Sequence, residues 1–341
     1  MSYLKRTLGG PAGAILLAFF LAAVAMLVAG VSPLDGFEAL FIGSLGGRNQ
    51  IAETLVQTTA LLFPALGITL AFRAGLFNIG AEGQLVIGGL AAGALGAHFA
   101  PATPLAIFVL LAAGFVGGGI WGGIAGWLRA QFNANEIIST LMLNFVALAV
   151  ANYLVSGPLK ASNASGAETT PLPASSYLPT LIPDTRLSIA IVIAIGAAIV
   201  LRWLLKRTVF GYELRASGEA PDAARRNGVN MPRMTLLALT LSGAIAGLGG
   251  ATIVTGVLHR FNTQLSPGYG YTAIAVALVG DLNPLWVCVA AFGFGILEAG
   301  GLAMQALADV PKDAIHVIEG LIILVLAARR YVATRAEAAP I

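Results

Sequence analysis

The chain alternates between long apolar runs and short segments that are polar or rich in glycine. An apolar run of about 20 residues can cross the hydrocarbon core of a bilayer as a helix. The pattern therefore predicts an all-α polytopic membrane protein with about ten transmembrane helices, whose boundaries are defined to within a few residues. The predicted spans are approximately 12–31, 51–72, 84–99, 105–128, 136–156, 187–205, 234–258, 272–280, 285–305 and 314–328. The eighth is too short to cross, so we expect a half-helix or one that extends into the preceding loop.

Two stretches, 51–156 and 234–328, share one order of elements: a long helix, a glycine-rich break, a short helix and two further helices. Their breaks are expected on opposite sides of the membrane, which is typical of inverted-topology repeats. Such breaks are also common in any polytopic chain rich in glycine. We predict a single transmembrane domain over 1–341, with 12–31 as a peripheral first helix, an outer loop at 157–186 and a cytoplasmic loop at 206–233.

The composition supports a membrane protein without enzymatic activity. Of the 341 residues, 57% are hydrophobic and only 10% are charged, whereas soluble domains carry about 25% charged residues. The 42 glycines favour close packing of helices. The single cysteine, Cys288, excludes a disulfide framework within the chain and a cysteine-rich zinc cluster. Phosphate-binding loops of the GxxxxGK[ST] type and nucleophile or metalloprotease motifs are missing from the sequence, so we expect no cofactor, metal site or catalytic residue.

The distribution of basic residues predicts the orientation. With a cytoplasmic N-terminus, 14 of the 19 Lys and Arg residues lie on the cytoplasmic side. This excess predicts that both termini are cytoplasmic, and such clustering suits membrane topology better than nucleic-acid binding. The first apolar run is longer than the core of a signal peptide, which has roughly 7–15 residues, and this favours a retained helix.

The segment 75–84 interrupts the helical pattern between two apolar runs. It contains three glycines together with Asn78, Glu82 and Gln84. A broken backbone at membrane depth is tolerated only where protein covers it or water fills a cavity, and a carboxylate there indicates a functional site. The alternative is a cytoplasmic turn in which Asn78 caps a helix and Glu82 lies near its positive end.

Further polar residues are candidates for a solute path. Glu136, Ser139 or Thr140, and Asn144 recur at three- or four-residue spacing and can share one helix face; they could equally hydrogen-bond between helices. Tyr269 and Tyr271 could stack on a base or belong to an interfacial aromatic belt. The complete set of path candidates is Asn78, Glu82, Gln84, Glu136, Asn144, Tyr269, Tyr271 and Glu298, of which Glu298 lies deepest in an apolar run.

The cytoplasmic loop 206–233 is predicted to contain a short helix over 221–227. Pro221 suits the first helical position, Asp222 the first turn, and Gly228 the position after the helix. A helix this short does not persist alone in water. We therefore expect it to pack against a partner.

Three motifs carry a resemblance to a known family. They are Leu-Phe-Asn-Ile-Gly-Ala-Glu-Gly-Gln at 76–84, the polar helix start at 133–144, and the loop 211–229. Together they resemble the permease subunits of bacterial ABC importers for nucleosides, within the branched-chain amino acid and simple-sugar permease superfamily. The resemblance covers about 50–328. This chain has Ala220 where the family usually has Asn, which removes one potential helix cap.

The resemblance implies the partners and the mechanism. It implies an ABC ATPase subunit that binds ATP, a second permease that is a different chain, an extracytoplasmic solute-binding protein and a small-molecule solute, with this chain in the bacterial inner membrane. The short helix would couple to the ATPase, and alternating access would carry the solute inward. The residues implied in ATPase coupling are Gly218, Glu219, Pro221, Asp222, Ala224, Arg225, Arg226 and Gly228.

Three other functions stay open at this stage. A simple-sugar importer of the ribose type would differ from a nucleoside importer in few residues of the solute pocket. An ion-coupled secondary transporter would use intramembrane carboxylates such as Glu82 and Glu298, and would work without an ATPase. A channel would show passive flux without saturation. The long cytoplasmic motif favours the ABC importer over the last two.

Overall fold

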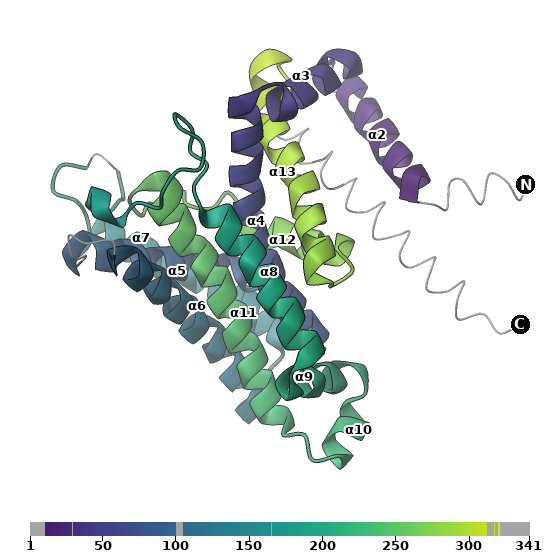
Figure 1. Cartoon of the computed structure of the whole chain (residues 1–341), viewed down its shortest axis with the longest axis vertical. Coiled ribbons are helices and arrows are strands. Elements are labelled where there is room, and N and C mark those ends of the chain that lie inside the picture. The colour runs from purple at the N-terminus through teal and green to yellow at the C-terminus, as the bar shows by residue number, and fades with distance from the viewer. Residues whose placement is uncertain are drawn as a thin grey trace, which may run out of the picture. The chain divides into compact units, whose positions relative to one another are not determined.

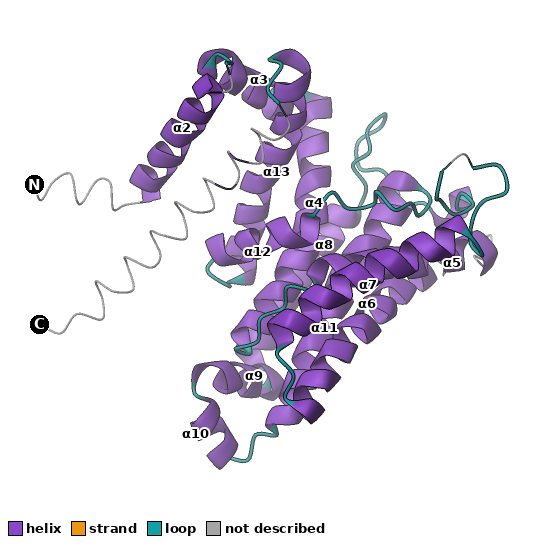
Figure 2. Ribbon diagram, turned by 180° about the vertical axis from the view of Figure 1, so that it is seen from behind, coloured by secondary structure: helices purple, strands orange, loops and turns teal. Residues whose placement is uncertain are grey.

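The structure is a computed structural model that describes residues 11–28, 30–99, 105–164, 166–311, 317 and 320. It is 76% helical, and the described residues contain no strand, only two isolated β-bridges (Figure 2). The elements are α2 (Pro11–Val28), α3 (Pro33–Leu45), α4 (Arg48–Arg73), α5 (Ala81–Phe99), α6 (Leu105–Phe132), α7 (Glu136–Ser156), η1 (Ala174–Ser176), α8 (Ala190–Arg207), α9 (Val209–Glu219), α10 (Pro221–Arg226), α11 (Met231–Ile253), the π-helical turn η2 (Val254–Leu258), α12 (Tyr269–Val279) and α13 (Pro284–Leu307).

The all-helical prediction is confirmed, whereas ten spans are not. Within the described residues, five helices are long and apolar enough to cross a membrane, namely α4, α6, α7, α11 with η2, and α13. A sixth span results if the bent pair Phe19–Val28 and Pro33–Leu45, which meet at 119°, is counted as one. The predicted half-helix is present as the 11-residue α12. The predicted span 314–328 lies outside the described residues apart from two positions.

The described residues divide into two compact units, those within 1–57 and 293–341 and those within 58–292. In the second unit, α5, α6 and α11 pack closely together and α7 lies against α5 and α6 (Figure 1). Glycines make this approach possible. A Cβ on Gly247 of α11 would overlap the Gly114 carbonyl oxygen of α6, and one on Gly118 would overlap the Gly243 carbonyl oxygen. Small residues of this kind let two helix backbones come into direct contact.

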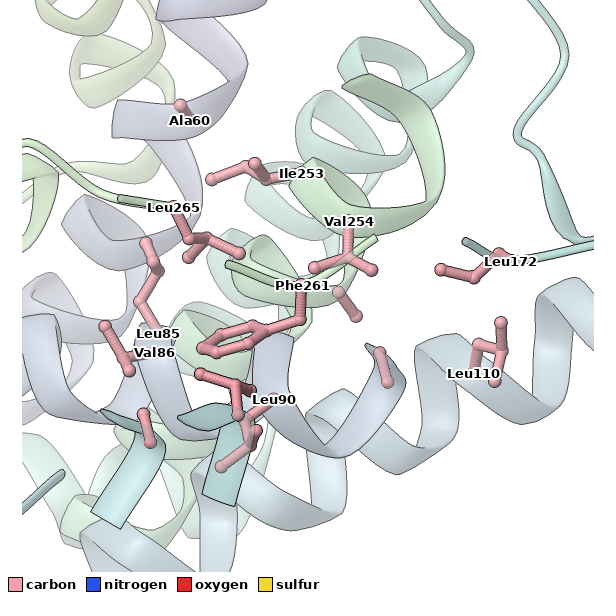
Figure 3. Close-up of a cluster of buried hydrophobic side chains, with 14 residues drawn as sticks. Ala60, Leu85, Val86, Leu90, Leu110, Leu172, Ile253, Val254, Phe261 and Leu265 are labelled. Atoms are coloured by element: carbon pink, nitrogen blue, oxygen red, sulfur yellow. The ribbon is translucent and has the colours of Figure 1, made fainter. Parts of the chain in front are cut away.

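An apolar cluster stabilises the part of the second unit around η2. Phe261, which is fully buried, lies among Leu85, Leu90 and Val254 (Figure 3). These residues come from α5, from the π-helical turn and from the segment after it. Burying an aromatic side chain contributes about 1.5–3 kcal/mol, so the cluster fixes the irregular segment that follows η2.

The first unit has a separate core. Met26 of α2 packs with Leu40 of α3 and Met304 of α13. The Thr54 hydroxyl donates to the Ser44 carbonyl oxygen at 2.8 Å, which ties the start of α4 to the end of α3. The helix α3 begins at a Ser32 cap followed by Pro33 and Asp35, which is a favourable helix start.

The long loop between α7 and α8, which the sequence predicts on the outer side, is tied to the segment after η2 by a set of contacts that we call the outer clasp. The Thr169 amide donates to the Phe261 carbonyl oxygen at 2.9 Å, and the Leu172 amide donates to the His259 carbonyl oxygen at 2.8 Å. Tyr177 stacks on His259 with ring centroids 3.7 Å apart. Arg260 and Glu168 form an ion pair at 2.7 Å. The loop is therefore an ordered cap over this segment, and a role in docking an external partner stays a prediction.

We predict that Gly247→Ala destabilises the chain by about 1–3 kcal/mol, because the added methyl group overpacks the contact with α6. The matched control is Gly196→Ala, since a Cβ on Gly196 meets nothing within 4 Å and alanine favours the helix. Thermal unfolding of the purified chain in detergent measures both. Equal midpoints for the two variants would contradict the close contact between α6 and α11.

The outer clasp is predicted to weaken in acid. Burial lowers the pKa of His259, so the neutral ring stabilises the fold fully above about pH 6.5, and this contribution is lost as the pH falls below 6.5 towards the lowered pKa. Between pH 7.5 and 5.5, the thermal midpoint should fall about 1–3 °C further in the wild type than in His259→Phe, which keeps an aromatic ring on Tyr177. Identical pH profiles would show that His259 does not titrate in the clasp.

Candidate functional site

The predicted break is present between α4 and α5. The helix α4 ends at Arg73, α5 begins at Ala81, and the residues 74–80 are not helical. Gly75 has φ +73°, a conformation that favours glycine. The Leu76 amide donates back to the Ala71 carbonyl oxygen at 3.0 Å and closes the end of α4. The remaining polar groups of the break depend on side chains from other helices.

Asn78 is the centre of the first hydrogen-bond network, and its side chain is fully buried. Its Nδ2 donates to Gln84 Oε1 at 2.9 Å and to Ser242 Oγ at 2.7 Å. Its Oδ1 accepts from the Gly80 amide at 2.9 Å and from Gln84 Nε2 at 3.1 Å. Ser242 in turn donates to the Gly67 carbonyl oxygen at 2.6 Å. Both donors and both lone pairs of the Asn78 amide are therefore used within the protein.

Asn144 is the centre of the second network and approaches the same break from α7. Its Oδ1 accepts from the Gly83 amide at 2.9 Å, and its Nδ2 donates to the Ile79 carbonyl oxygen at 2.9 Å and to the Tyr271 hydroxyl at 3.2 Å. Thr140, one turn earlier on α7, accepts from the Ile79 amide at 3.2 Å. Thr140 and Asn144 of the polar face predicted on this helix thus hold the end of the break and the first turn of α5.

Glu82 joins the starts of α5 and α12. Its side chain is only 3% exposed, and its Oε2 accepts from the Gly270 amide in the first turn of α12 at 2.7 Å. A Cβ on Gly270 would overlap the Glu82 amide nitrogen, so the two backbones are in contact. A carboxylate between two helix N-termini is favourably placed, because both helix dipoles present their positive ends.

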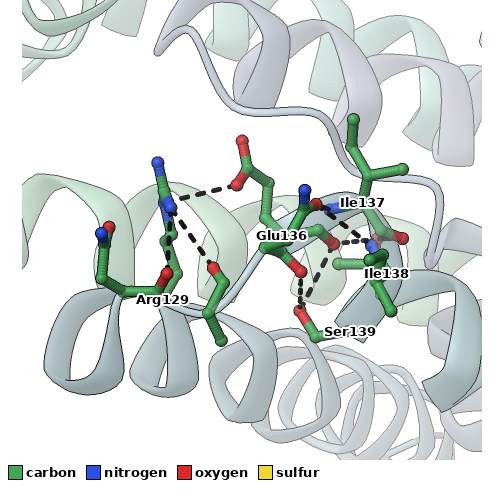
Figure 4. A network of polar contacts seen from close by, with 9 residues as sticks. Arg129, Glu136, Ile137, Ile138 and Ser139 are labelled. Carbon is green, nitrogen blue, oxygen red and sulfur yellow. Dashed lines mark hydrogen bonds and ion pairs between the residues drawn. The ribbon is translucent and has the colours of Figure 1, made fainter.

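Glu136 is placed in a local network at the start of α7. Its carboxylate pairs with Arg129 at 3.3 Å, and Arg129 also donates to the Asn133 and Ala134 carbonyl oxygens at 3.4 Å (Figure 4). Asn135 caps α7, because its Oδ1 accepts from the Ile137 amide at 2.9 Å and from the Ile138 amide at 3.3 Å. These contacts stabilise the turn between α6 and α7.

The two tyrosines have different surroundings. Tyr269 is partly buried and packs against the apolar cluster around Phe261. Tyr271 is 41% exposed although its hydroxyl is held by Asn144. Glu298 is half-buried on α13, within the other compact unit. The structure therefore brings Asn78, Glu82, Gln84, Asn144 and Tyr271 to the break before α5, whereas Glu136 pairs with Arg129 at the start of α7.

The short helix predicted within the loop 206–233 is present as α10, and a second helix, α9, precedes it (Figure 1). Ala224 is the buried residue of α10. Its neighbours Pro221, Asp222, Arg225 and Arg226 are exposed, as are Glu219 and Gly228 beside it, whereas Gly218 is partly buried. The helix is thus anchored on one side and open on the other.

Sequence reasoning missed the partners that lie far along the chain. Ser242 is an ordinary residue of an apolar helix in the sequence, yet it bonds to Asn78, 164 residues earlier. Arg73 donates to the carbonyl oxygens of Leu282 at 2.9 Å and Asp281 at 3.2 Å. The position of Arg73 directly before a glycine-rich break was the available signal for a cap at a helix end.

The architecture defines a multi-pass helical membrane protein with a broken helix whose polar groups are held from other helices. The family model described as "Branched-chain amino acid transport system / permease component" matches residues 50–327, and the chain belongs to this permease family. No solved structure matches it.

Characterised relatives cover almost the whole chain. The guanosine ABC transporter permease protein NupP of Bacillus subtilis is 35% identical, covering 93% of this chain and 92% of the relative. The nucleoside ABC transporter permease protein NupB of Lactococcus lactis is 32% identical over 94% and 90%. The glucose ABC transporter permease protein TsgB13 of Haloferax volcanii is 33% identical over 93% and 86%.

We predict that Asn78→Leu destabilises the chain by at least about 1–3 kcal/mol, because the buried amide of Gln84 loses its partner. Adding Gln84→Leu should recover part of this loss, since removing both partners leaves fewer unsatisfied groups. Thermal unfolding measures the effect, with Asn152→Leu on the exposed part of α7 as the control. If the double variant loses as much stability as the two single variants added together, Asn78 and Gln84 do not act as a reciprocal pair.

Proposed function

We propose that this chain is the permease subunit of an ABC importer for nucleosides. In this proposal it forms the solute path and cycles by alternating access, while a separate ATPase subunit binds and hydrolyses ATP. The observation that carries the proposal is α10, a six-residue helix with an open, charged side. So short a helix needs tertiary contacts, and its exposed Arg225 and Arg226 offer a docking surface for a partner.

The solute class is supported by the names of the relatives. Two of these three relatives are described as permeases for guanosine or nucleosides, and the third as a glucose permease. A sugar such as ribose is therefore the second candidate solute. Tyr271 favours the nucleoside, because its ring is exposed while its hydroxyl is fixed, and an aromatic ring can stack on a base. Asn78, Glu82, Gln84 and Asn144 would then shape the path rather than contact the solute.

The wider architecture belongs to the same proposal. With about ten spans and inverted repeats, the chain would enter the break before α5 from one side of the membrane and the break before α12 from the other, so that the two breaks could meet in the middle. The contact between Glu82 and Gly270, at the starts of α5 and α12, supports such a meeting. The complex would contain a second, different permease chain, an ATPase and an extracytoplasmic solute-binding protein, in the inner membrane of a bacterium with both termini of this chain cytoplasmic.

We predict that Arg225→Glu/Arg226→Glu lowers the amount of ATPase that co-purifies with the tagged chain by at least about tenfold, because two exposed charges on the docking surface are reversed. Lys160→Glu, an exposed charge reversal in the outer loop, is the control. Both variants are purified from native membranes in mild detergent, and the ATPase is quantified. Wild-type recovery of the ATPase by the double variant would refute α10 as the docking helix.

Transport assays separate the alternatives. In proteoliposomes with the complete complex, nucleosides but not ribose should stimulate ATP hydrolysis when the binding protein is present. Stimulation by ribose alone would establish the sugar importer. Uptake by this chain alone that stops when an ion gradient is collapsed would establish a secondary transporter instead.

A further inference from the structure

The helix α9, which leads into α10, is in backbone contact with the broken segment. A Cβ on Gly218 would lie 2.5 Å from the Arg73 carbonyl oxygen and 2.6 Å from the Gly75 amide nitrogen. A Cβ on Gly75 would lie 2.9 Å from the Gly218 Cα. We call this contact the Gly75–Gly218 joint. It has no flexible side chain between the two backbones, so a displacement of α9 must also displace the residues 73–75.

The residues that flank the break hold both ends of α12. Arg73, the last residue of α4, donates to the Leu282 and Asp281 carbonyl oxygens just after the C-terminus of α12, at 2.9 and 3.2 Å. Glu82, in the first turn of α5, accepts from the Gly270 amide at the N-terminus of α12 at 2.7 Å. A positive charge at the C-terminal end and a negative charge at the N-terminal end both suit the helix dipole.

The two observations form one continuous connection. It runs from the exposed helix α10 through α9 and the Gly75–Gly218 joint to the broken segment, and from there to the two ends of α12. The first turn of α12 carries the exposed Tyr271, whose hydroxyl is bonded to Asn144. All of these residues lie within the compact unit 58–292.

We propose that the Gly75–Gly218 joint transmits movement of the cytoplasmic helices to α12, with Arg73 and Glu82 as positioning residues at its two ends. The transmitted movement reorients Tyr271 and the path beside it. This inference rests on the proposed function, because α10 receives its movement from the ATPase. It adds to that function the residues through which the movement reaches the path.

Hydrogen exchange on the full chain in lipid nanodiscs tests the connection without any ATPase. Gly218→Ala should accelerate amide exchange in α12 by about fivefold or more, the low end of coupling between two sites, and leave α6 unchanged. Gly196→Ala, with an open glycine on α8, should change neither. If Gly218→Ala cannot be purified in folded form, Arg73→Gln is tested in its place, because it removes the contact at the other side of the connection.

A double substitution distinguishes transmission from separate packing effects. If the joint acts through Arg73, Gly218→Ala with Arg73→Gln should accelerate exchange in α12 no more than the stronger single variant. Multiplied effects of the two substitutions would overturn the proposal. Unchanged exchange of α12 in a folded Gly218→Ala variant would also overturn it.

Transport by the complete complex provides the second readout. In proteoliposomes with the ATPase and the binding protein, Arg73→Gln should lower nucleoside uptake per ATP hydrolysed by about fivefold or more, while Gly196→Ala should match the wild type. A normal ratio in Arg73→Gln would overturn the proposed joint. Wild-type chains that show no ATP-driven uptake would instead refute the proposed function, and the exchange experiment would still report on the contact itself.

Discussion

A helix that breaks among apolar neighbours leaves backbone amides and carbonyls that lipid cannot satisfy, and the structure is arranged around this constraint. The side chains that satisfy the break come from elsewhere: Asn144 and Thr140 from α7, with Ser242 of α11 holding Asn78 in place. Because α5 begins at this break, its position depends on amides and hydroxyls of other helices. The polar residues are conspicuous in the sequence, but most of their capacity is used to hold the backbone.

The second constraint is the closeness of the helices. Around α11, glycines bring backbones into contact with both α6 and α5, since Gly247 lies against Gly114 and Gly88. The same chemistry recurs at the Gly75–Gly218 joint outside the helix bundle. Contacts without intervening side chains are stiff, because close-packed atoms transmit displacement instead of absorbing it. The unit 58–292 thus combines stiff backbone contacts with one break that hydrogen bonds hold in place.

Sequence reasoning succeeded where the signals are local. Pro221 and Asp222 indicated α10, and the glycines of 75–84 indicated the break. It missed α3, whose Ser32 and Pro33 are equally local signals, because the apolar run before them was treated as a single span. It could not find the contact of Gly270 with Glu82, because 188 residues separate them and nothing near either residue specifies the other. The candidate site was thus predictable as a set of polar residues, but their pairing depends on tertiary packing.

The partnership of Glu82 with Gly270 has a consequence for biosynthesis. During translation at about 5–20 residues per second, the 188 residues between them take roughly 10–40 s to emerge. Throughout that interval the Glu82 carboxylate lacks the amide it accepts from in the finished protein, and a bare carboxylate in hydrocarbon is costly. The start of α5 therefore cannot settle into its final place when it leaves the ribosome. Until α12 has been made, the aqueous interface is the less costly place for this carboxylate.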